Sequence, residues 1–453
     1  MQIAAHLRQK IVRPGSALCL TVLSAFLLVA CDPDVADPSS TSEYGSLYNG
    51  TTPPVLVGLG GSLIAGMQDG AVYERASANG FLNLMAQQMG ITEFEYPKVP
   101  EPGAGFPRVR LHGFDAMGNP VTTRSTELTP PTNLDVPRAY NVLGVPGALV
   151  SDMMFEGDFS AHPNPFLALV ARNPAFGASL VAQAAGLQPD VLVIWTGNND
   201  VLLWANTGGD GSGGLAEPTA PEAFDALYNQ LLDKVAELMP NTKVIVLNIP
   251  DVEAAPYFTT LPWNILPLDA ATAAQLNAVP AYQALGISFQ AGQNGPVYVN
   301  KTATGGIKQA AEGDLLLLTL PTDSLAAGWG TAVPIPDRYV LDAGEAQIVQ
   351  THIDAYNQSI SAAVAKHANV TLYDANETFN RVNMQGYPMV GSSPLTSSFI
   401  SGGIFSMDGI HPCSRGYGVV ANELLAMINT KFNADLPLVQ LPLLPAVYLD
   451  DVP

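Results

Sequence analysis

Short apolar runs alternate with stretches of helical periodicity along most of this chain, and this alternation constrains the fold more than any other feature. The predicted strands are residues 55–59, 140–143, 191–195, 244–247 and 370–373. Helical spacing of apolar residues covers 73–89, 166–185, 223–238, 345–368 and 417–432. Runs that are apolar on both faces of a strand are typical of parallel sheets covered on two sides. The sequence therefore predicts an α/β class fold, with three α/β/α layers around a parallel sheet.

Two regions interrupt this alternation. Residues 93–137 are rich in Pro and Gly and have no sustained period, whereas residues 257–340 include the apolar run 315–318. An insertion as long as 257–340 inside a compact domain should carry its own structure. We expect it to form a cap or side wall over a cleft. Trp263, Trp329 and the run 315–318 either line a pocket there or, as is more common for such residues, form the core of the insertion. The alternative is a subdomain packed away from the cleft, in which these side chains form its core.

The N-terminus has the pattern of an export signal. Arg8, Lys10 and Arg13 precede an apolar run that ends just before Cys31. This run is too short for a membrane-spanning helix. The cysteine after it resembles the lipobox of bacterial lipoproteins, in which that residue is acylated; a simple signal peptide with a chance cysteine is the alternative. We expect lipidation at Cys31 and an anchored protein of the cell envelope, on either membrane.

The chain then divides into four parts: a lipoprotein signal peptide at 1–30, a flexible tether at 31–52, a main domain at 53–435 and a C-terminal tail at 436–453. The tether is rich in Pro, Ser and Gly, which is typical of flexible linkers. Only Cys413 remains in the exported body after Cys19 and Cys31 are set aside. No disulfide within that body is therefore expected.

The composition limits the possible partners. Hydrophobic residues make up 47% of the chain and charged residues 13%, so a large core can be buried. The formal net charge of -21 repels phosphate backbones, so nucleic-acid binding is not expected. Contact with a membrane is expected through the N-terminal lipid alone, because an acidic surface is not attracted to anionic head groups.

Polar or glycine residues follow three of the predicted strands. Ser62 comes directly after the run that ends in Gly60-Gly61, Gly147 follows the second strand and Asn199 follows the third. Each of these segments is explained equally well by an ordinary turn. The carboxyl ends of parallel strands are, however, where open α/β sheets bind ligands, so Ser62 is also a candidate nucleophile.

His411 is the candidate base. Of the six histidines it is the one outside the signal and the long helix with a carboxylate, Asp408, three residues before it. A carboxylate at this spacing can receive one ring N–H while the other ring nitrogen faces a hydroxyl, as in a Ser-His-Asp triad. Asp408, His411 and Cys413 are also metal-ligand types, but we expect no metal and no cofactor.

The order of these segments resembles the four blocks of the SGNH, or GDSL-type, esterase and lipase superfamily. The most specific pieces are Gly197-Asn-Asn-Asp200 and Asp408-Gly-Ile-His-Pro412. The resemblance implies an SGNH hydrolase-like fold and a serine ester hydrolase that acts on a lipid or an acylated small molecule. It implies that Ser62 is the nucleophile, that His411 and Asp408 complete the triad, and that Ser62, Gly147 and Asn199 form the oxyanion hole. The chain has no Gly-x-Ser-x-Gly elbow, which disfavours the larger α/β-hydrolase family.

One position departs from the family pattern. The first block usually reads Gly-Asp-Ser-Leu, and here Gly61 replaces the aspartate. That aspartate is not a triad member, so catalysis is not excluded. A non-catalytic binding lipoprotein that keeps the fold stays open, as does a carbohydrate acetylesterase, because the blocks leave the acyl and alcohol parts of the substrate undefined.

Overall fold

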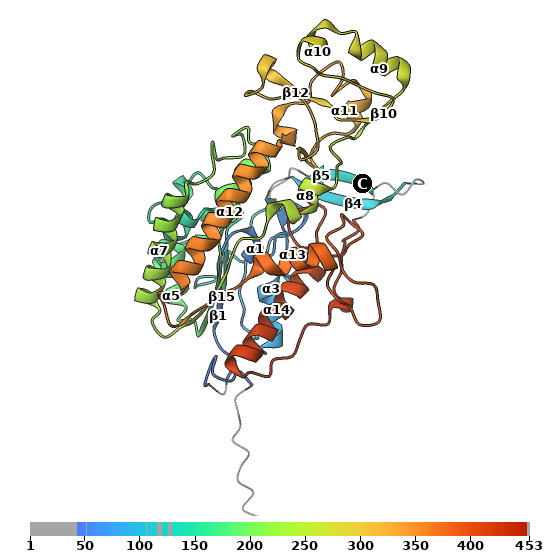
Figure 1. The fold of residues 1–453 in the computed structure, drawn as a ribbon. Helices are drawn as coiled ribbons and strands as arrows, with labels where there is room; N and C mark the ends of the chain where they lie inside the picture. Colours follow the sequence, from blue (N-terminus) through green and yellow to red (C-terminus); the bar gives the residue numbers. More distant parts are fainter. Residues whose placement is uncertain (1–42, 51, 106, 116–119, 126–128, 451–453) are drawn as a thin grey trace, which may run out of the picture. The chain divides into compact units, whose positions relative to one another are not determined.

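The computed structural model describes residues 43–50, 52–105, 107–115, 120–125 and 129–450. Its centre is a five-stranded sheet in the order β15-β8-β7-β1-β6, in which every neighbouring pair is parallel (Figure 1). The strands are β1 Leu56–Gly60, β6 Val142–Gly144, β7 Val191–Trp195, β8 Lys243–Leu247 and β15 Val370–Tyr373. The predicted α/β/α class with a parallel sheet is confirmed.

Alternate side chains of each strand face two different helical layers. In β7, Leu192 and Ile194 belong to a core shared with α5 (Leu180–Gly186), α7 (Pro221–Leu238) and α12 (Ala343–Val364). Val193 and Trp195 belong to the opposite core, with α3 (Phe81–Gln88) and α14 (Ser414–Phe432). Full burial of one such side chain contributes about 1.5–3 kcal/mol, so both layers are strongly coupled to the sheet.

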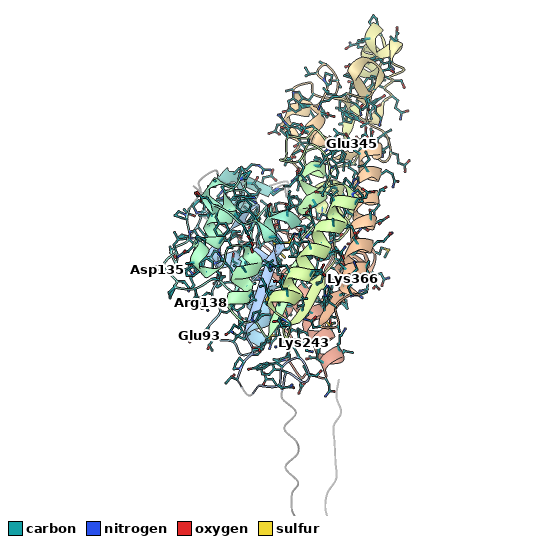
Figure 2. All side chains as sticks on the ribbon, turned by 90° about the vertical axis from the view of Figure 1, so that its left-hand side faces the viewer. Glu93, Asp135, Arg138, Lys243, Glu345 and Lys366 are labelled. Atoms are coloured by element: carbon teal, nitrogen blue, oxygen red, sulfur yellow. The ribbon has the colours of Figure 1, made fainter. Side chains whose placement is uncertain are left out.

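The helices α7 and α12 lie side by side on their face of the sheet (Figures 1 and 2). Phe224 of α7 stacks on Tyr356 of α12 with ring centroids 3.9 Å apart. Beyond the C-terminal end of α12, the Lys366 ammonium donates to the Asn229 side chain at 2.6 Å. Figure 2 shows Glu345 in the first turn of α12 and Lys366 just past its C-terminal end.

The N-terminus of α12 is closed by a capping box. The Asp342 side chain accepts the backbone N–H of Glu345, and the Glu345 side chain accepts the backbone N–H of Asp342.

Two of the predicted helices are interrupted. Residues 73–89 form α2 (Glu74–Ser77) and α3, and residues 166–185 form α4 (Phe166–Ala171), a 3₁₀ turn at Pro174–Phe176 and α5. Gly80 separates the first pair, where it packs closely against Gly66. Pro174 separates the second pair, because proline lacks an N–H and disfavours helix in the residue before it. The helices α6 (Asn199–Ala205) and α13 (Ala375–Gln385) were not predicted.

The insertion at 257–340 carries its own small sheets and apolar clusters. It contains the pairs β9–β10, β11–β12 and β13–β14, with bounds Leu266–Leu268, Gly292–Asn294, Val297–Val299, Ile307–Gln309, Leu315–Leu316 and Val340–Leu341. Figure 1 shows its helices α9 (Ala270–Asn277) and α10 (Pro280–Ala284) beyond the N-terminal end of α12. Trp329 packs on Tyr339 in one of its clusters, with ring centroids 5.9 Å apart.

The described part of the C-terminal tail, residues 436–450, packs on the domain. Near its end, the Asp450 carboxylate forms ion pairs with the guanidinium groups of Arg75, Arg108 and Arg110. The N···O distances are 2.8, 3.2 and 3.3 Å. The Asp450 N–H also donates to Leu111 of β4 (Arg108–Phe114), which pairs with β5 (Pro120–Ser125). The tail, to which the sequence assigned no role, thus fixes an irregular region of the chain to the body.

Most of the N-terminal segment predicted to carry the signal and the tether lies outside the described residues. The signal peptide at 1–30, Cys31 and the tether as far as residue 42 are not described. The last part of the predicted tether is described and is packed: Tyr44 and Leu47 are buried, and the Tyr44 hydroxyl donates to Met89 O at 2.9 Å. These two apolar side chains join the α3–α14 core, so this part of 31–52 is not a flexible linker. In the described residues, no helix is long and apolar enough to cross a membrane.

We predict that Asp450→Asn lowers the free energy of unfolding by about 3 kcal/mol, since breaking a buried ion pair leaves a charge without its partner. Arg108, which is 2% exposed, would keep Glu101 as its one ion-pair partner among the described residues. Urea unfolding of the variant and the wild type measures the difference. Glu237→Gln, which removes an exposed pair with Lys234, is the control and should cost less than about 0.5 kcal/mol. Equal small effects of both substitutions would contradict a stabilising role of the tail.

Candidate active site

The candidate residues meet at one edge of the sheet because three of them follow neighbouring strands. Ser62 begins α1 (Ser62–Ala65) directly after β1, Asn199 begins α6 after β7, and Gly147 lies in the turn after β6. The register pairs Gly60 with Gly144 on one side and with Trp195 on the other, so the three strands end level. Parallel pairing thereby places the nucleophile candidate between the two oxyanion-donor candidates.

The turn between β1 and α1 requires close backbone approach. A Cβ on Gly60 would lie 2.0 Å from the carbonyl oxygen of Trp195. Without a side chain there, Gly61 N–H donates to the same carbonyl at 3.1 Å, and Val145 N–H donates to Gly60 O at 2.9 Å. These bonds extend the pairing of three strands past the sheet and fix where Ser62 begins its helix.

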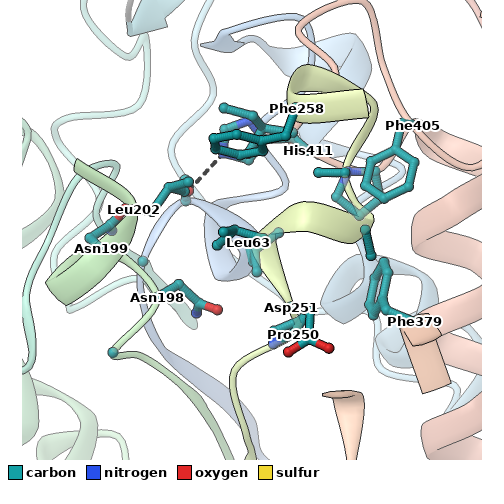
Figure 3. A pocket seen from close by; sticks show the side chains of 18 of the residues that line it. Leu63, Asn198, Asn199, Leu202, Pro250, Asp251, Phe258, Phe379, Phe405 and His411 are labelled. Atoms are coloured by element: carbon teal, nitrogen blue, oxygen red, sulfur yellow. Dashed lines mark hydrogen bonds between the residues drawn. The ribbon is translucent and has the colours of Figure 1, made fainter. Parts of the chain in front are cut away.

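Ser62, His411 and Asp408 form a continuous chain of hydrogen bonds. His411 Nε2 lies 2.8 Å from Ser62 Oγ, and His411 Nδ1 lies 2.8 Å from Asp408 Oδ2 (Figure 3). Because a carboxylate can only accept, Nδ1 carries the ring proton and Nε2 is left to accept the serine proton. Ser62 and His411 are both 8% exposed. This arrangement can move a proton from the hydroxyl to the imidazole.

The Asp408 carboxylate is held in its charged form. Backbone N–H groups of Ile410 and His411 donate to Oδ1 at 2.8 Å each, and Gly70 N–H donates to Oδ2 at 2.6 Å. Burial alone would raise the pKa of Asp408, but its interaction with the His411 side chain and the backbone hydrogen bonds from His411 and Ile410 hold the pKa below its ordinary value. The carboxylate therefore stays an acceptor for the imidazole.

Residues outside the predicted site shape the loop that carries Asp408 and His411. Asp69 accepts Met407 N–H at 2.9 Å, and its own N–H donates to Ser406 Oγ at 2.9 Å. Burial raises the pKa of Asp69 to about 6, although hydrogen bonds from the Tyr73 hydroxyl and Met407 oppose the shift. Gly409 has a φ of +72°, and a Cβ there would lie 2.9 Å from Tyr257 N, so the loop requires glycine at this point.

The three predicted oxyanion donors differ in their surroundings. Neither the Ser62 N–H nor the Gly147 N–H donates to an acceptor among the described residues. Asn199 Nδ2 donates one proton to Ala148 O at 2.9 Å, which leaves its second proton for a ligand. Asn164 Nδ2 donates to Pro146 O at 2.9 Å and so orients the peptide that carries the Gly147 N–H. Ser62 and Asn199 line the pocket described below, whereas Gly147 does not.

The glycine that replaces the family aspartate lies against one of these donors. A Cβ on Gly61 would be 3.2 Å from Asn199 Nδ2, with no other described atom within 4 Å. The φ of Gly61 is -88°, so its backbone does not require glycine. A carboxylate at this position would compete for the amide of Asn199, and Gly61 leaves that amide to Ala148 and the pocket.

The pocket beside Ser62 is mostly apolar. Its walls come from the starts of α1 and α6, the segment after β8, the start of the insertion, α13 and the loop before α14. Three phenylalanines, Phe258, Phe379 and Phe405, line it together with Leu63, Leu202 and Ile410 (Figure 3). An apolar pocket with a few polar groups at one side is typical of small-molecule sites.

The insertion contributes one side chain, Phe258, to the described lining of this pocket. Phe258 lines the pocket, but Trp263, Trp329 and the run 315–318 do not. Trp329 instead fills a cluster within the insertion, and Leu316 and Leu317 are buried in cores outside the pocket. For Trp329 and the run 315–318, the alternative interpretation, in which these side chains form structural cores, agrees with the structure. Trp263 is partly buried and belongs to none of the apolar clusters of the described residues.

Sequence reasoning missed Asp69 and the three phenylalanines. Asp69 lies in Met67-Gln-Asp-Gly70, which looks like an ordinary turn, and its contacts with the candidate catalytic loop join residues more than 300 positions apart. Phe379 lies on α13, which was not predicted as a helix, and Phe405 lies in the loop before α14. No group of three or more His, Cys, Asp or Glu in the described residues is placed to hold a metal ion. Cys413 is buried and its thiol donates to Gly403 O at 3.1 Å.

Comparison with known proteins gives one family. A family model described as GDSL-like Lipase/Acylhydrolase matches residues 56–424, which includes all site candidates from Ser62 to His411. No curated protein sequence matches the chain. Among solved structures, the chain is similar to an alpha/beta hydrolase enzyme from the metagenome of Lake Arreo, Spain. The two are 14% identical with a TM-score of 0.37, over 85% of this chain and 98% of that chain.

A buried carboxylate next to Asn199 is expected to make the stability of the protein depend on pH. Asp200 is 1% exposed and accepts Val150 N–H at 3.1 Å and the Thr219 hydroxyl at 2.9 Å. Burial raises the pKa of Asp200 to about 7, against the lowering effect of these hydrogen bonds. Below about pH 4 the side chain is protonated in both folded and unfolded chains, so it adds no pH dependence there. Between the unfolded and folded pKa values only the unfolded chain ionises, so stability falls as pH rises to about 7.

We predict that Asp200→Asn removes this loss of stability with rising pH. The free energy of unfolding of the variant, relative to the wild type, should increase between pH 4 and pH 8 by up to about 4 kcal/mol, the equivalent of a three-unit shift. Urea unfolding at several pH values measures the difference. Asp225→Asn on the exposed side of α7 is the control for the removal of one carboxylate. A difference between Asp200→Asn and wild type that is constant with pH would contradict the prediction.

Proposed function

Because the chain belongs to the GDSL-like lipase/acylhydrolase family and is a hydrolase of the esterase and lipase type, we propose that it cleaves carboxylic esters through a Ser62–His411–Asp408 triad. The observation that supports this most directly is the pair of 2.8 Å contacts from His411, one to the Ser62 hydroxyl and one to Asp408. Ser62 and His411 also line the same apolar pocket, where an ester group could reach both.

In the proposed reaction, Ser62 Oγ attacks the ester carbonyl carbon while His411 Nε2 takes the hydroxyl proton. The carbonyl oxygen becomes an oxyanion that accepts hydrogen bonds from Ser62 N–H, Gly147 N–H and Asn199 Nδ2. His411 then gives its proton to the departing alcohol. Water attacks the acyl-serine with His411 again as base, which releases the carboxylic acid and restores Ser62. Asp408 holds the imidazole in the tautomer that both steps need.

The apolar walls support an ester with an apolar part next to the scissile bond. The phenylalanine and leucine side chains around Ser62 would bury such a group. A carbohydrate acetylesterase would instead need hydrogen-bonding groups for sugar hydroxyls close to the serine. Hydrolysis of p-nitrophenyl esters of different acyl lengths, compared with acetylated glycans, separates the two substrate classes.

We predict that Ser62→Ala and His411→Ala each lower kcat for a p-nitrophenyl ester by about 10⁴-fold or more, because triad members act as a unit. A fluorophosphonate probe should label the wild type and not the Ser62→Ala variant. Ser392→Ala, at an exposed position, is the matched control and should keep wild-type activity and labelling. Activity retained in Ser62→Ala would refute the mechanism. A wild type that is neither active nor labelled would favour the non-catalytic binding lipoprotein.

We further propose, on the N-terminal sequence alone, that the protein is exported and anchored to a membrane of the cell envelope by lipid on Cys31. Two or more acyl chains would hold it stably, since one chain binds only marginally. We predict that Cys31→Ser moves the protein from the membrane fraction to the soluble fraction after cell lysis. Cys19→Ser, which changes a cysteine inside the signal, is the control and should leave the distribution unchanged. Membrane association of the Cys31→Ser variant would exclude the lipid anchor.

A further inference from the structure

The pocket beside Ser62 contains a carboxylate that the proposed reaction does not use. Asp251 lies shortly after the end of β8 and lines the same pocket as Ser62 and His411. Figure 3 shows Phe258 and His411 on one side of the pocket and Asp251 on the other, with Leu63 between them. None of the described residues that line this pocket is Lys or Arg. Asp251 therefore brings negative charge to mostly apolar walls.

Neutral amide groups hold the Asp251 carboxylate in place. Gln350 of α12 and Asn376 of α13 donate to Oδ1 at 3.2 and 2.9 Å, and Asn380 of α13 donates to Oδ2 at 2.7 Å. In the described part of the chain, no basic side chain forms an ion pair with Asp251. Amide donors fix the orientation of a carboxylate but do not neutralise it. The negative charge is left for a ligand to compensate.

The aromatic walls of the pocket favour the same kind of ligand. Phe379 and Phe405 contact each other with ring centroids 6.1 Å apart, and Phe258 lines the pocket with them. The face of an aromatic ring is negative, so it attracts an alkylammonium group and also excludes water from it. Aromatic rings beside an uncompensated carboxylate accept an organic cation better than they accept a neutral or anionic group.

We propose that this pocket selects esters whose acyl or alcohol part carries an ammonium group, which Asp251 and the phenylalanine rings receive. The inference rests on the proposed ester hydrolysis at Ser62 and names its substrate class. Binding would place the cation near Asp251 while the ester carbonyl reaches Ser62 and the oxyanion donors. The formal net charge of -21 acts in the same direction, because it attracts cationic substrates from solution.

A purely structural role for Asp251 makes a different prediction. Its amide contacts join the segment after β8 to α12 and α13, so loss of the side chain could loosen the pocket. Such loosening would lower the hydrolysis of charged and neutral esters to the same extent. Charge selection would change the ratio between a cationic ester and a neutral ester of the same shape.

The test compares Asp251→Asn with the wild type on matched substrates. On the alcohol side, the pair is butyrylcholine and 3,3-dimethylbutyl butyrate. On the acyl side, the pair is p-nitrophenyl 4-(trimethylammonio)butyrate and p-nitrophenyl 5,5-dimethylhexanoate. Within each pair, a quaternary nitrogen replaces a quaternary carbon. Asp354→Asn is the control, because Asp354 also accepts from Gln350, at 2.9 Å, but is exposed on α12 outside the pocket.

We expect the wild type to prefer the cationic ester of at least one pair by about tenfold in kcat/KM, since a charge pair with cation–π contact is worth this much. Asp251→Asn should remove that preference and change the neutral ester by less than about twofold, and Asp354→Asn should keep it. The pair that shows the effect identifies the part of the ester that enters the pocket. No preference in the wild type, or equal losses on both esters in Asp251→Asn, would overturn the inference.

A second measurement needs no variant and remains informative if Asp251→Asn fails to fold. Butyltrimethylammonium should inhibit wild-type hydrolysis of p-nitrophenyl butyrate competitively, and at least about tenfold more strongly than its neutral analogue 2,2-dimethylhexane. Equal inhibition by the two compounds would overturn the inference. Fluorophosphonate labelling of Ser62 distinguishes a failure of the proposed charge selection from a failure of the proposed ester hydrolysis. Labelling without charge preference refutes this inference alone, whereas absence of labelling and activity refutes the proposed function.

Discussion

The parallel pairing of β1 with both β6 and β7 is the constraint on which the site depends. Since Gly60 is in register with Gly144 and with Trp195, the chain leaves the sheet at three neighbouring points on one edge. Backbone hydrogen bonds from Gly61 and Val145 continue this pairing into the turns. The position of Ser62 between Gly147 and Asn199 is therefore a consequence of strand register, and a slip of one residue would turn the strand side chains to the opposite face.

The fourth segment of the site needs a different kind of support, because it follows no strand of the sheet. The Asp408–His411 loop is held by side chains and backbone groups of residues 69–70, and by Tyr257 N–H on Gly409 O. Asp69 in turn accepts from Tyr73, whose ring faces the Arg108 guanidinium at 3.7 Å, and Arg108 pairs with Asp450. A continuous chain of contacts thus links the C-terminal tail to the candidate catalytic loop.

The sequence determines those parts of the structure that depend on local patterns. The strands β7 and β15 begin and end where their apolar runs predict. In β7 full burial on both faces leaves little choice of register. The ends of parallel strands and short loop motifs can be recognised in the sequence alone. This is why the sequence could identify four of the site residues, namely Ser62, Asn199, Asp408 and His411. Their meeting at one place follows from the topology.

Other features could not be predicted, since they depend on contacts between distant residues. Glycine and proline at 80 and 174 divide two periodic segments into separate helices, although periodicity alone continues through them. Tyr44 and Leu47 lie in a polar segment that reads as a linker, yet two buried side chains suffice to attach it to α3 and α14. The pocket walls combine Phe258, Phe379 and Phe405 from three separate segments, and no local pattern marks them as neighbours.

The two carboxylates near the pocket show how the choice of donors decides what an acidic side chain can do. The Asp408 carboxylate accepts hydrogen bonds from backbone N–H groups and from the His411 ring. Its charge is therefore satisfied within the protein, and it orients that imidazole. Asp251 receives amide groups from side chains, which hold it without a counter-charge. A carboxylate of the first kind acts on its own chain. A carboxylate of the second kind lies beside aromatic rings and has no basic neighbour in the described pocket. Its charge is available to a cationic group of a bound ligand. This difference is the physical ground for assigning Asp251 to substrate selection.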